Sequence, residues 1–143
     1  MNYLVRKRNK FSNKTTTYNG RWYQSKHEAS VAQDLDLARH AVDERERVVN
    51  ITPQFSITFY GTKDGFITDE HVPGCIKIGQ YRPDFLVEYA DGHKKIIEAK
   101  GAFLMKDRAF RQLWTLTEIL YGYKYPDVEL EIIQNQAWKK RFG

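Results

Sequence analysis

The stretch YRPDFLVEYADGHKKIIEAKG, residues 81–101, constrains the fold of this chain more than any other segment. It holds two apolar runs, residues 82–89 and 93–100, which are separated by the tight-turn sequence Asp91-Gly92. Asp-Gly between two such runs is a strong local signal for an antiparallel β-hairpin. We therefore expect a hairpin whose first strand begins, and whose second strand ends, at the same edge of a sheet.

The open end of this hairpin carries charged residues. Side chains alternate across a strand, so Glu98 and Lys100 share one face, about 6.6–6.8 Å apart along it. Antiparallel pairing brings Asp84, which follows Pro83, close to both of them. Mg²⁺ prefers oxygen ligands, which the two carboxylates and the Ala99 carbonyl could supply. The pattern predicts a metal site for phosphodiester hydrolysis, in which Lys100 orients water or offsets developing negative charge.

An ordinary structural explanation fits part of this pattern as well. Glu and Lys two positions apart on an exposed strand are common, and so short a motif often matches by chance. Pro83 favours the functional interpretation, because it fixes the backbone next to Asp84. The apolar neighbours favour it too, because they place the charges on a buried sheet, where charges without a role are costly. These neighbours are Phe85, Leu86, Val87, Ile96 and Ile97.

The rest of the chain adds helices and further strands to this hairpin. In chain order we expect a short hairpin at 18–23, a helix at 25–45, an extended segment at 48–60, a long loop at 61–80, the two hairpin strands, a helix at 106–121 and a strand at 128–133. Phe110 and Trp114 of the second helix are expected in the core. This order predicts a mixed β-sheet with a helix on each side, which is an α/β sandwich of three layers.

The length and the charge distribution suggest one domain with basic ends. A chain of 143 residues fits a basic flexible arm at 1–17, a single domain at 18–134 and a short basic tail at 135–143. Residues 1–26 hold seven Lys or Arg and no acid, whereas residues 27–138 hold 13 basic and 18 acidic residues. Basic ends suit a polyanion and an acidic body suits metal ions, although solvated tails would have the same composition.

Basic side chains in the arm and on the second helix are the expected DNA contacts. Arg108 and Arg111 lie three positions apart on that helix, where they could hold a phosphate or belong to a solvated face. The residues predicted to bind DNA are Arg6, Lys7, Arg8, Lys10, Lys14, Arg21, Lys26, Arg108 and Arg111.

The sequence argues against a membrane protein, a disulfide-linked protein and a zinc site. No run of about 18 apolar residues could span a bilayer, and no apolar stretch follows the basic N-terminus as in a secretory signal. The one cysteine, Cys75, cannot form an internal disulfide, and with His71 it lacks the further ligands of a zinc site. We expect a cytoplasmic protein with no membrane partner, in the host cytoplasm if a phage encodes it.

Pro83-Asp84, followed after a hairpin by Glu98-Ala99-Lys100, resembles the signature of the PD-(D/E)xK, or restriction-like, nuclease superfamily. The resemblance is closest to phage endonucleases of the Holliday-junction-resolving type and covers roughly residues 18–134. Upstream, Ser25-Lys26-His27-Glu28 is similar to the Ser-x-x-Glu element that opens the first helix in such enzymes, and Gln54-Phe55 is similar to a later segment.

The resemblance implies a restriction-endonuclease-like three-layer sandwich and a metal-dependent DNA endonuclease. It implies one or two Mg²⁺ ions, with Mn²⁺ as a substitute, held by Asp84, Glu98, the Ala99 carbonyl and Glu28. It also implies branched DNA as the substrate and a homodimer, since a resolvase must cut two strands. Glu28 could equally cap its helix together with Ser25, and the two roles are compatible. Two alternatives stay open: a catalytically silent DNA-binding accessory protein, and a site-specific or single-strand nuclease that cuts duplex or single-stranded DNA.

Overall fold

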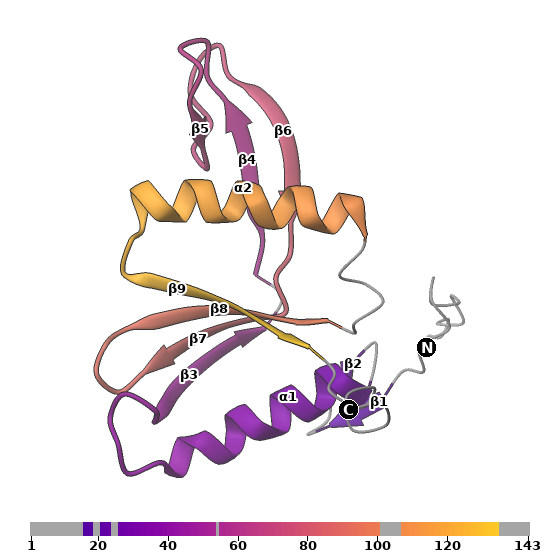
Figure 1. Ribbon diagram of the computed structural model, residues 1–143, viewed down its shortest axis with the longest axis vertical. Helices are drawn as coiled ribbons and strands as arrows, with labels where there is room; N and C mark the ends of the chain where they lie inside the picture. Colours follow the sequence, from indigo (N-terminus) through magenta and orange to yellow (C-terminus); the bar gives the residue numbers. More distant parts are fainter. Residues whose placement is uncertain (1–15, 19–20, 24–25, 54, 101–106, 135–143) are drawn as a thin grey trace, which may run out of the picture.

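A four-stranded mixed sheet forms the centre of the protein (Figure 1). The structure is a computed structural model that describes residues 16–18, 21–23, 26–53, 55–100 and 107–134. The strand order is β3-β7-β8-β9, in which only the β8–β9 pair is parallel. The four strands are β3 (Val48–Pro53), β7 (Phe85–Tyr89), β8 (Lys94–Lys100) and β9 (Val128–Gln134). The expected mixed sheet of an α/β protein is confirmed.

The β7–β8 hairpin forms where the sequence predicts it. The Gly92 N–H donates to the Tyr89 carbonyl at 2.9 Å, and the Tyr89 N–H donates to the His93 carbonyl at 3.0 Å. Gly92 has a φ of 96°, a backbone conformation that residues with a Cβ rarely adopt. Beyond this turn the strands pair in register, with Phe85 opposite Ile97.

One helix covers each face of the sheet, so the sheet lies between two cores (Figure 1). Helix α1 (Lys26–Leu37) covers one face and α2 (Arg108–Lys124) covers the other. The core under α1 contains Ala29, Val31, Ala32, Leu35, Val48, Phe85, Val87, Tyr89 and Ile97. The core under α2 contains Ile57, Phe59, Tyr81, Ile96, Phe110, Trp114 and Leu120, which confirms the places predicted for Phe110 and Trp114.

Helix α1 is shorter than the sequence suggests. The expectation of a helix to residue 45 is wrong, since α1 ends at Leu37 and only a 3₁₀ turn, η2 (Ala38–His40), follows. The next residues pack against the hairpin turn instead. The Ala90 N–H donates to the Arg47 carbonyl at 2.8 Å, and the Asp91 N–H donates to the Glu44 carbonyl at 3.2 Å. These long-range hydrogen bonds replace the ones that further helical turns would make.

A second sheet, with strand order β5-β4-β6, projects past α2, and we call it the β-arm (Figure 1). Its strands are β4 (Ile57–Gly61), β5 (Ile67–Thr68) and β6 (Ile76–Tyr81). The loop predicted at 61–80 is therefore wrong. Gly65 and Gly74, with φ of 89° and 82°, lie between strands as turn residues. The extended segment predicted at 48–60 is two strands, β3 and β4, in different sheets.

Near the N-terminus, β1 (Thr16–Tyr18) and β2 (Arg21–Tyr23) pair antiparallel, as the Asn19-Gly20 sequence predicts. The rest of the predicted basic arm and the predicted tail at 135–143 lie outside the described residues. Neither helix in the described part of the chain is long and apolar enough to cross a membrane.

Candidate active site

The hairpin brings Asp84 and Glu98 together at its open end. Phe85 pairs with Ile97, so one step further along the strands Asp84 lies across from Glu98. The Ala99 backbone N–H donates to Asp84 Oδ2 at 2.7 Å, which fixes that carboxyl group against β8. Ile96, two residues before Glu98, belongs to the core under α2, so the Glu98 side chain lies on the α2 face of the sheet.

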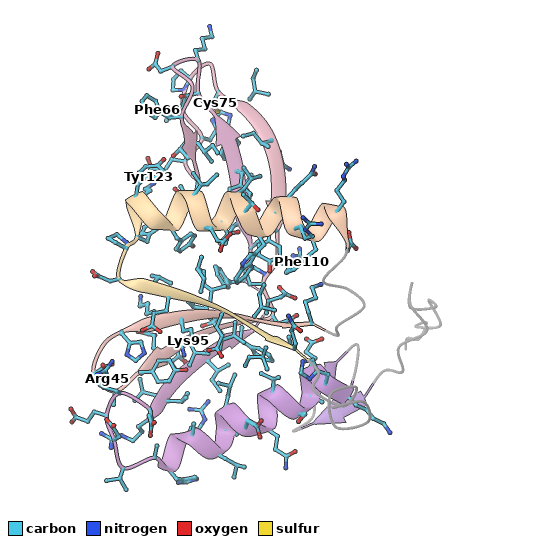
Figure 2. The ribbon with its side chains drawn as sticks, viewed as in Figure 1. Arg45, Phe66, Cys75, Lys95, Phe110 and Tyr123 are labelled. Carbon is cyan, nitrogen blue, oxygen red and sulfur yellow. The ribbon has the colours of Figure 1, made fainter. Side chains whose placement is uncertain are left out.

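Glu98 is only 3% exposed, and both of its carboxyl oxygens have a partner. The hydroxyl of Tyr81 donates to Glu98 Oε1. The Lys100 ammonium lies 3.6 Å from Glu98 Oε2 and 4.4 Å from the centre of the Phe110 ring. Figure 2 shows Phe110 reaching from α2 toward the sheet. Lys100 is thus held between the acid pair and an aromatic ring.

The surroundings of Asp84 and Glu98 disfavour the ionised form of both acids. Burial, and then the nearby Asp84 carboxylate, raise the pKa of Glu98 to about 9. Burial also raises the pKa of Asp84, while hydrogen bonds from Glu98 and Ala99 and the charge of Lys100 oppose that rise. Burial raises the pKa of Tyr81 as well, and the Glu98 charge adds to the effect. Two acids that resist ionising side by side, next to an amine, are typical of sites that bind a cation or move a proton.

A family model described as a protein of unknown function, DUF1064, matches residues 8–140. The chain belongs to the DUF1064 family. No curated protein matches it, and no solved structure matches it either.

Glu28 of this DUF1064 protein, the third predicted acid, lies in the first turn of α1 and is buried. Helix α1 packs on the face of the sheet opposite to α2. Within the described ranges, no three His, Cys, Asp or Glu side chains gather closely enough to hold a metal ion. Asp84 and Glu98 therefore form a pair, and their carboxylates are the hard oxygen donors that could hold a divalent cation here.

The predicted DNA contacts of the DUF1064 chain fall in several places. Arg108 and Arg111 are exposed on α2 and line an open groove of about 620 Å³, which we call the α2 groove. Its other lining residues are Ile78, Gln112, Thr115 and Leu116. Phe110 lies between the two arginines in sequence, but its side chain is buried toward the sheet and theirs are exposed, so the groove lies on the side of α2 that faces away from Phe110. Lys26 is exposed at the start of α1 and Arg21 lies in β2. Arg6, Lys7, Arg8, Lys10 and Lys14 lie outside the described residues.

Sequence reasoning missed two residues of this site, Tyr81 and His27. Tyr81 stands three positions before Asp84, between the loop predicted at 61–80 and the strand predicted from residue 82. The Nε2–H of His27 donates to the Ile133 carbonyl at 2.7 Å, across 106 positions of sequence, and its charge helps to oppose the raised pKa of Asp84. The alternation of Tyr81, Pro83 and Phe85 with the charged residues Arg82 and Asp84 could have extended the predicted strand to Tyr81. No local pattern could have identified His27.

The pair His71 and Cys75, judged too sparse for zinc, lies in the β-arm. The His71 ring packs edge-on against Tyr60, with 5.3 Å between ring centres, and Cys75 is a half-buried free thiol. Neither belongs to a metal-binding group of the residues that the structure describes.

Proposed function

We propose that this DUF1064 protein is a Mg²⁺-dependent DNA endonuclease with a restriction-endonuclease-like core, which acts on branched DNA as a homodimer. One observation carries the proposal: the buried Glu98 carboxyl, the half-buried Asp84 carboxyl and the Lys100 ammonium meet on one face at the open end of the β7–β8 hairpin. Their order along the chain, Pro-Asp and then Glu-Ala-Lys after a hairpin, is the order that the nuclease resemblance requires.

The chemistry of the pair supports a divalent cation. Burial raises the pKa of both acids, the Asp84 charge raises that of Glu98 further, and Lys100 compensates only in part. A doubly charged cation between these oxygens would remove this imbalance, and Mg²⁺ or Mn²⁺ suits carboxylate and carbonyl ligands. Asp84, Glu98 and the Ala99 carbonyl are the groups that would hold it. Glu28 would be needed only for a second ion.

Each residue then has a separate task in phosphodiester hydrolysis. A bound Mg²⁺ would lower the pKa of a water and offset charge on the scissile phosphate. Lys100, fixed over Phe110 and beside Glu98 Oε2, is placed to orient the attacking water. Arg108 and Arg111, exposed on the outer side of α2, would bind phosphates of the DNA away from the scissile bond.

A cleavage assay tests this function. Purified protein is incubated with a four-way junction, a plasmid and a single-stranded oligonucleotide, in Mg²⁺, Mn²⁺ or EDTA. We expect junction-selective nicking that EDTA and Glu98→Gln both abolish. Glu131→Gln, on the neighbouring strand β9 and exposed, is the matched control and should cut normally. Absence of cleavage on every substrate in both metals would contradict the proposal.

A second candidate, the DNA-binding accessory protein without turnover, is favoured by one observation. In the part of the chain that the structure describes, no third acid joins the Asp84–Glu98 pair. The α2 groove would be enough for binding alone. The same assay separates the two, since the accessory protein would retain junction DNA in a gel shift and leave it intact. Preferential cutting of plasmid or single strands would instead identify a site-specific or single-strand nuclease. Analytical ultracentrifugation tests the homodimer.

A further inference from the structure

Tyr81 connects the β-arm to the acid pair. It is the last residue of β6 and is 7% exposed. Its ring centre lies 6.3 Å from that of Phe110 and 6.3 Å from that of Trp114, which it meets edge-on. Aromatic rings that pack in this way leave the side chain little freedom. The phenol oxygen is therefore held at one place, and that place is against Glu98 Oε1.

The Glu98 carboxylate needs such a partner to hold a fixed orientation. The terminal torsion of a glutamate is soft, because it joins an sp³ carbon to an sp² carbon. Lys100 contacts Oε2 at 3.6 Å, which is an ion pair and too long for a hydrogen bond. The Tyr81 hydroxyl supplies the directional contact to the other oxygen. With both contacts, the plane of the carboxylate and the side that it presents to Asp84 are determined.

We infer that Tyr81 is a positioning residue of the reaction, which acts by orienting the Glu98 carboxylate as a ligand. This inference rests on the proposed function, because it takes Glu98 to be a metal ligand. Groups that hydrogen-bond to ligating carboxylates orient them, and the loss of such a group typically lowers metal affinity or activity by about 10–100-fold. Tyr81 itself would not contact the substrate.

Tyr81→Phe is the variant that isolates this role. It keeps the ring, and therefore the contacts to Phe110 and Trp114, and it deletes only the hydroxyl. A matched control exists at Tyr125, whose hydroxyl donates to Asp69 Oδ2 at 2.8 Å, at the other end of α2 from Phe110. Tyr125→Phe removes the same atom from the same kind of phenol–carboxylate contact, away from the acid pair.

Two measurements separate positioning from a general structural role. The first is the affinity for Mn²⁺ alone, measured by calorimetry on metal-free protein. The second is steady-state cleavage of junction DNA, resolved into kcat and KM. For Tyr81→Phe we expect about 10-fold weaker Mn²⁺ binding or more, and a lower kcat at unchanged KM. Tyr125→Phe should leave all three values at those of the wild type, even if both variants lose thermal stability.

The outcomes distinguish this inference from the function on which it rests. Wild-type protein that binds Mn²⁺ and cuts DNA, beside a Tyr81→Phe variant with the same affinity and kcat, would overturn the positioning role alone. Equal losses in Tyr81→Phe and Tyr125→Phe would overturn it as well, because a loss shared with a distant phenol is structural. Wild-type protein that neither binds the ion nor cuts DNA would overturn the proposed function and the role of Tyr81 together.

Discussion

The two ends of the β7–β8 hairpin differ in whether the fold favours the charged forms of their side chains. Near the turn, acids lie beside basic side chains: His93 Nδ1 lies 2.5 Å from Asp91, and the Lys95 ammonium lies 3.0 Å from Glu131. Hydrogen bonds from the backbone and the ring of His93 lower the pKa of Asp91. Burial opposes ionisation of Lys95, yet the hydrogen bond to Glu131 raises its pKa. Folding therefore favours the charged forms of Asp91 and Lys95.

At the open end the same two strands place acid beside acid. Glu98 is buried and Asp84 is half-buried beside it, and burial raises the pKa of both. The turn end therefore stabilises the fold, whereas the open end opposes it when its acids ionise. An arrangement that costs folding free energy is expected where a ligand is bound or a reaction occurs.

The largest expected effect separates the two lysines of β8. Lys100→Met should lower the rate of junction cleavage by at least about 10²–10³-fold, because a positioned cation beside the reacting phosphate is lost. Lys95→Met, in the same strand near the turn, should leave that rate unchanged. Figure 2 shows how far Lys95 lies from Phe110, over which Lys100 is held. Single-turnover kinetics measures both, and equal losses would remove the distinction between the two ends.

The next effect concerns stability against pH without metal. Glu98 titrates near 4.5 when unfolded and at about 9 when folded, so the folded protein binds more protons between these values. The free energy of unfolding should therefore fall as the pH rises from about 4.5 to about 9. Glu98→Gln cannot ionise, so at pH 8 it should be more stable than the wild type by roughly 1–3 kcal/mol. Near pH 4.5 the difference should disappear.

Urea unfolding in EDTA at pH 5 and pH 8 measures this difference. Asp91→Asn should behave in the opposite way. The pKa of Asp91 is lowered by folding, so its contribution is present above its unfolded pKa, 3.8, and the variant should lose stability at neutral pH. A Glu98→Gln variant that gained nothing at pH 8 would show that the open end carries no electrostatic cost.

A smaller effect compares basic residues at the two ends. Arg108→Ala with Arg111→Ala removes two charges from the α2 groove and should weaken DNA binding by about 10-fold. It should also reduce the slope of log affinity against log salt by about 1–2. Arg45→Ala with Lys94→Ala removes two exposed charges near the hairpin turn and is the matched control. Fluorescence anisotropy at several salt concentrations measures the DNA affinity of both double variants. Equal losses of affinity would mean that DNA does not prefer the α2 groove over the turn end.

The smallest expected effect is the contribution of the turn-end ion pair. Lys95→Met removes the contacts to Glu131 and to Glu129, both on β9 and both exposed. Water and salt screen such pairs, so the free energy of unfolding should fall by about 0.2–1 kcal/mol, and by less at high salt. Thermal unfolding at 50 mM and 500 mM salt measures it. If Lys95→Met lowered the free energy of unfolding by as much as Glu98→Gln raises it, the Lys95–Glu131 contact would be stronger than an exposed ion pair.

The sequence was sufficient to predict the hairpin and the meeting of Asp84 with Glu98. Asp91-Gly92 is a local turn signal, and once the turn is fixed, the register of two strands places Asp84 by counting. The second helix was predictable for the same reason, because Phe110 and Trp114 repeat at helical spacing. The placement of these elements depends on interactions within a few residues or across one turn.

Other features depend on contacts that no local pattern reveals. The β-arm was predicted as a loop because glycines and a proline interrupt residues 61–80, although the structure pairs short strands between these residues. The segment after α1 is not helical, and its Glu44 and Arg47 carbonyls accept hydrogen bonds from the hairpin turn, far away in the sequence. Tyr81 reaches Glu98 from a different sheet. Each of these outcomes is set by tertiary structure.

The parallel pairing of β9 with β8 bears on the smallest fragment of this protein that could work. A chain cut after Lys100 would retain Glu28, Asp84, Glu98 and Lys100, all four predicted catalytic residues. It would lack β9, which pairs with β8 from Lys94 to Lys100, and Phe110, which supports the Lys100 ammonium. The freed edge of β8 would be open to other chains and prone to aggregate. The four predicted catalytic residues are therefore not sufficient by themselves, and the smallest fragment that retains the support of this site extends at least to Gln134.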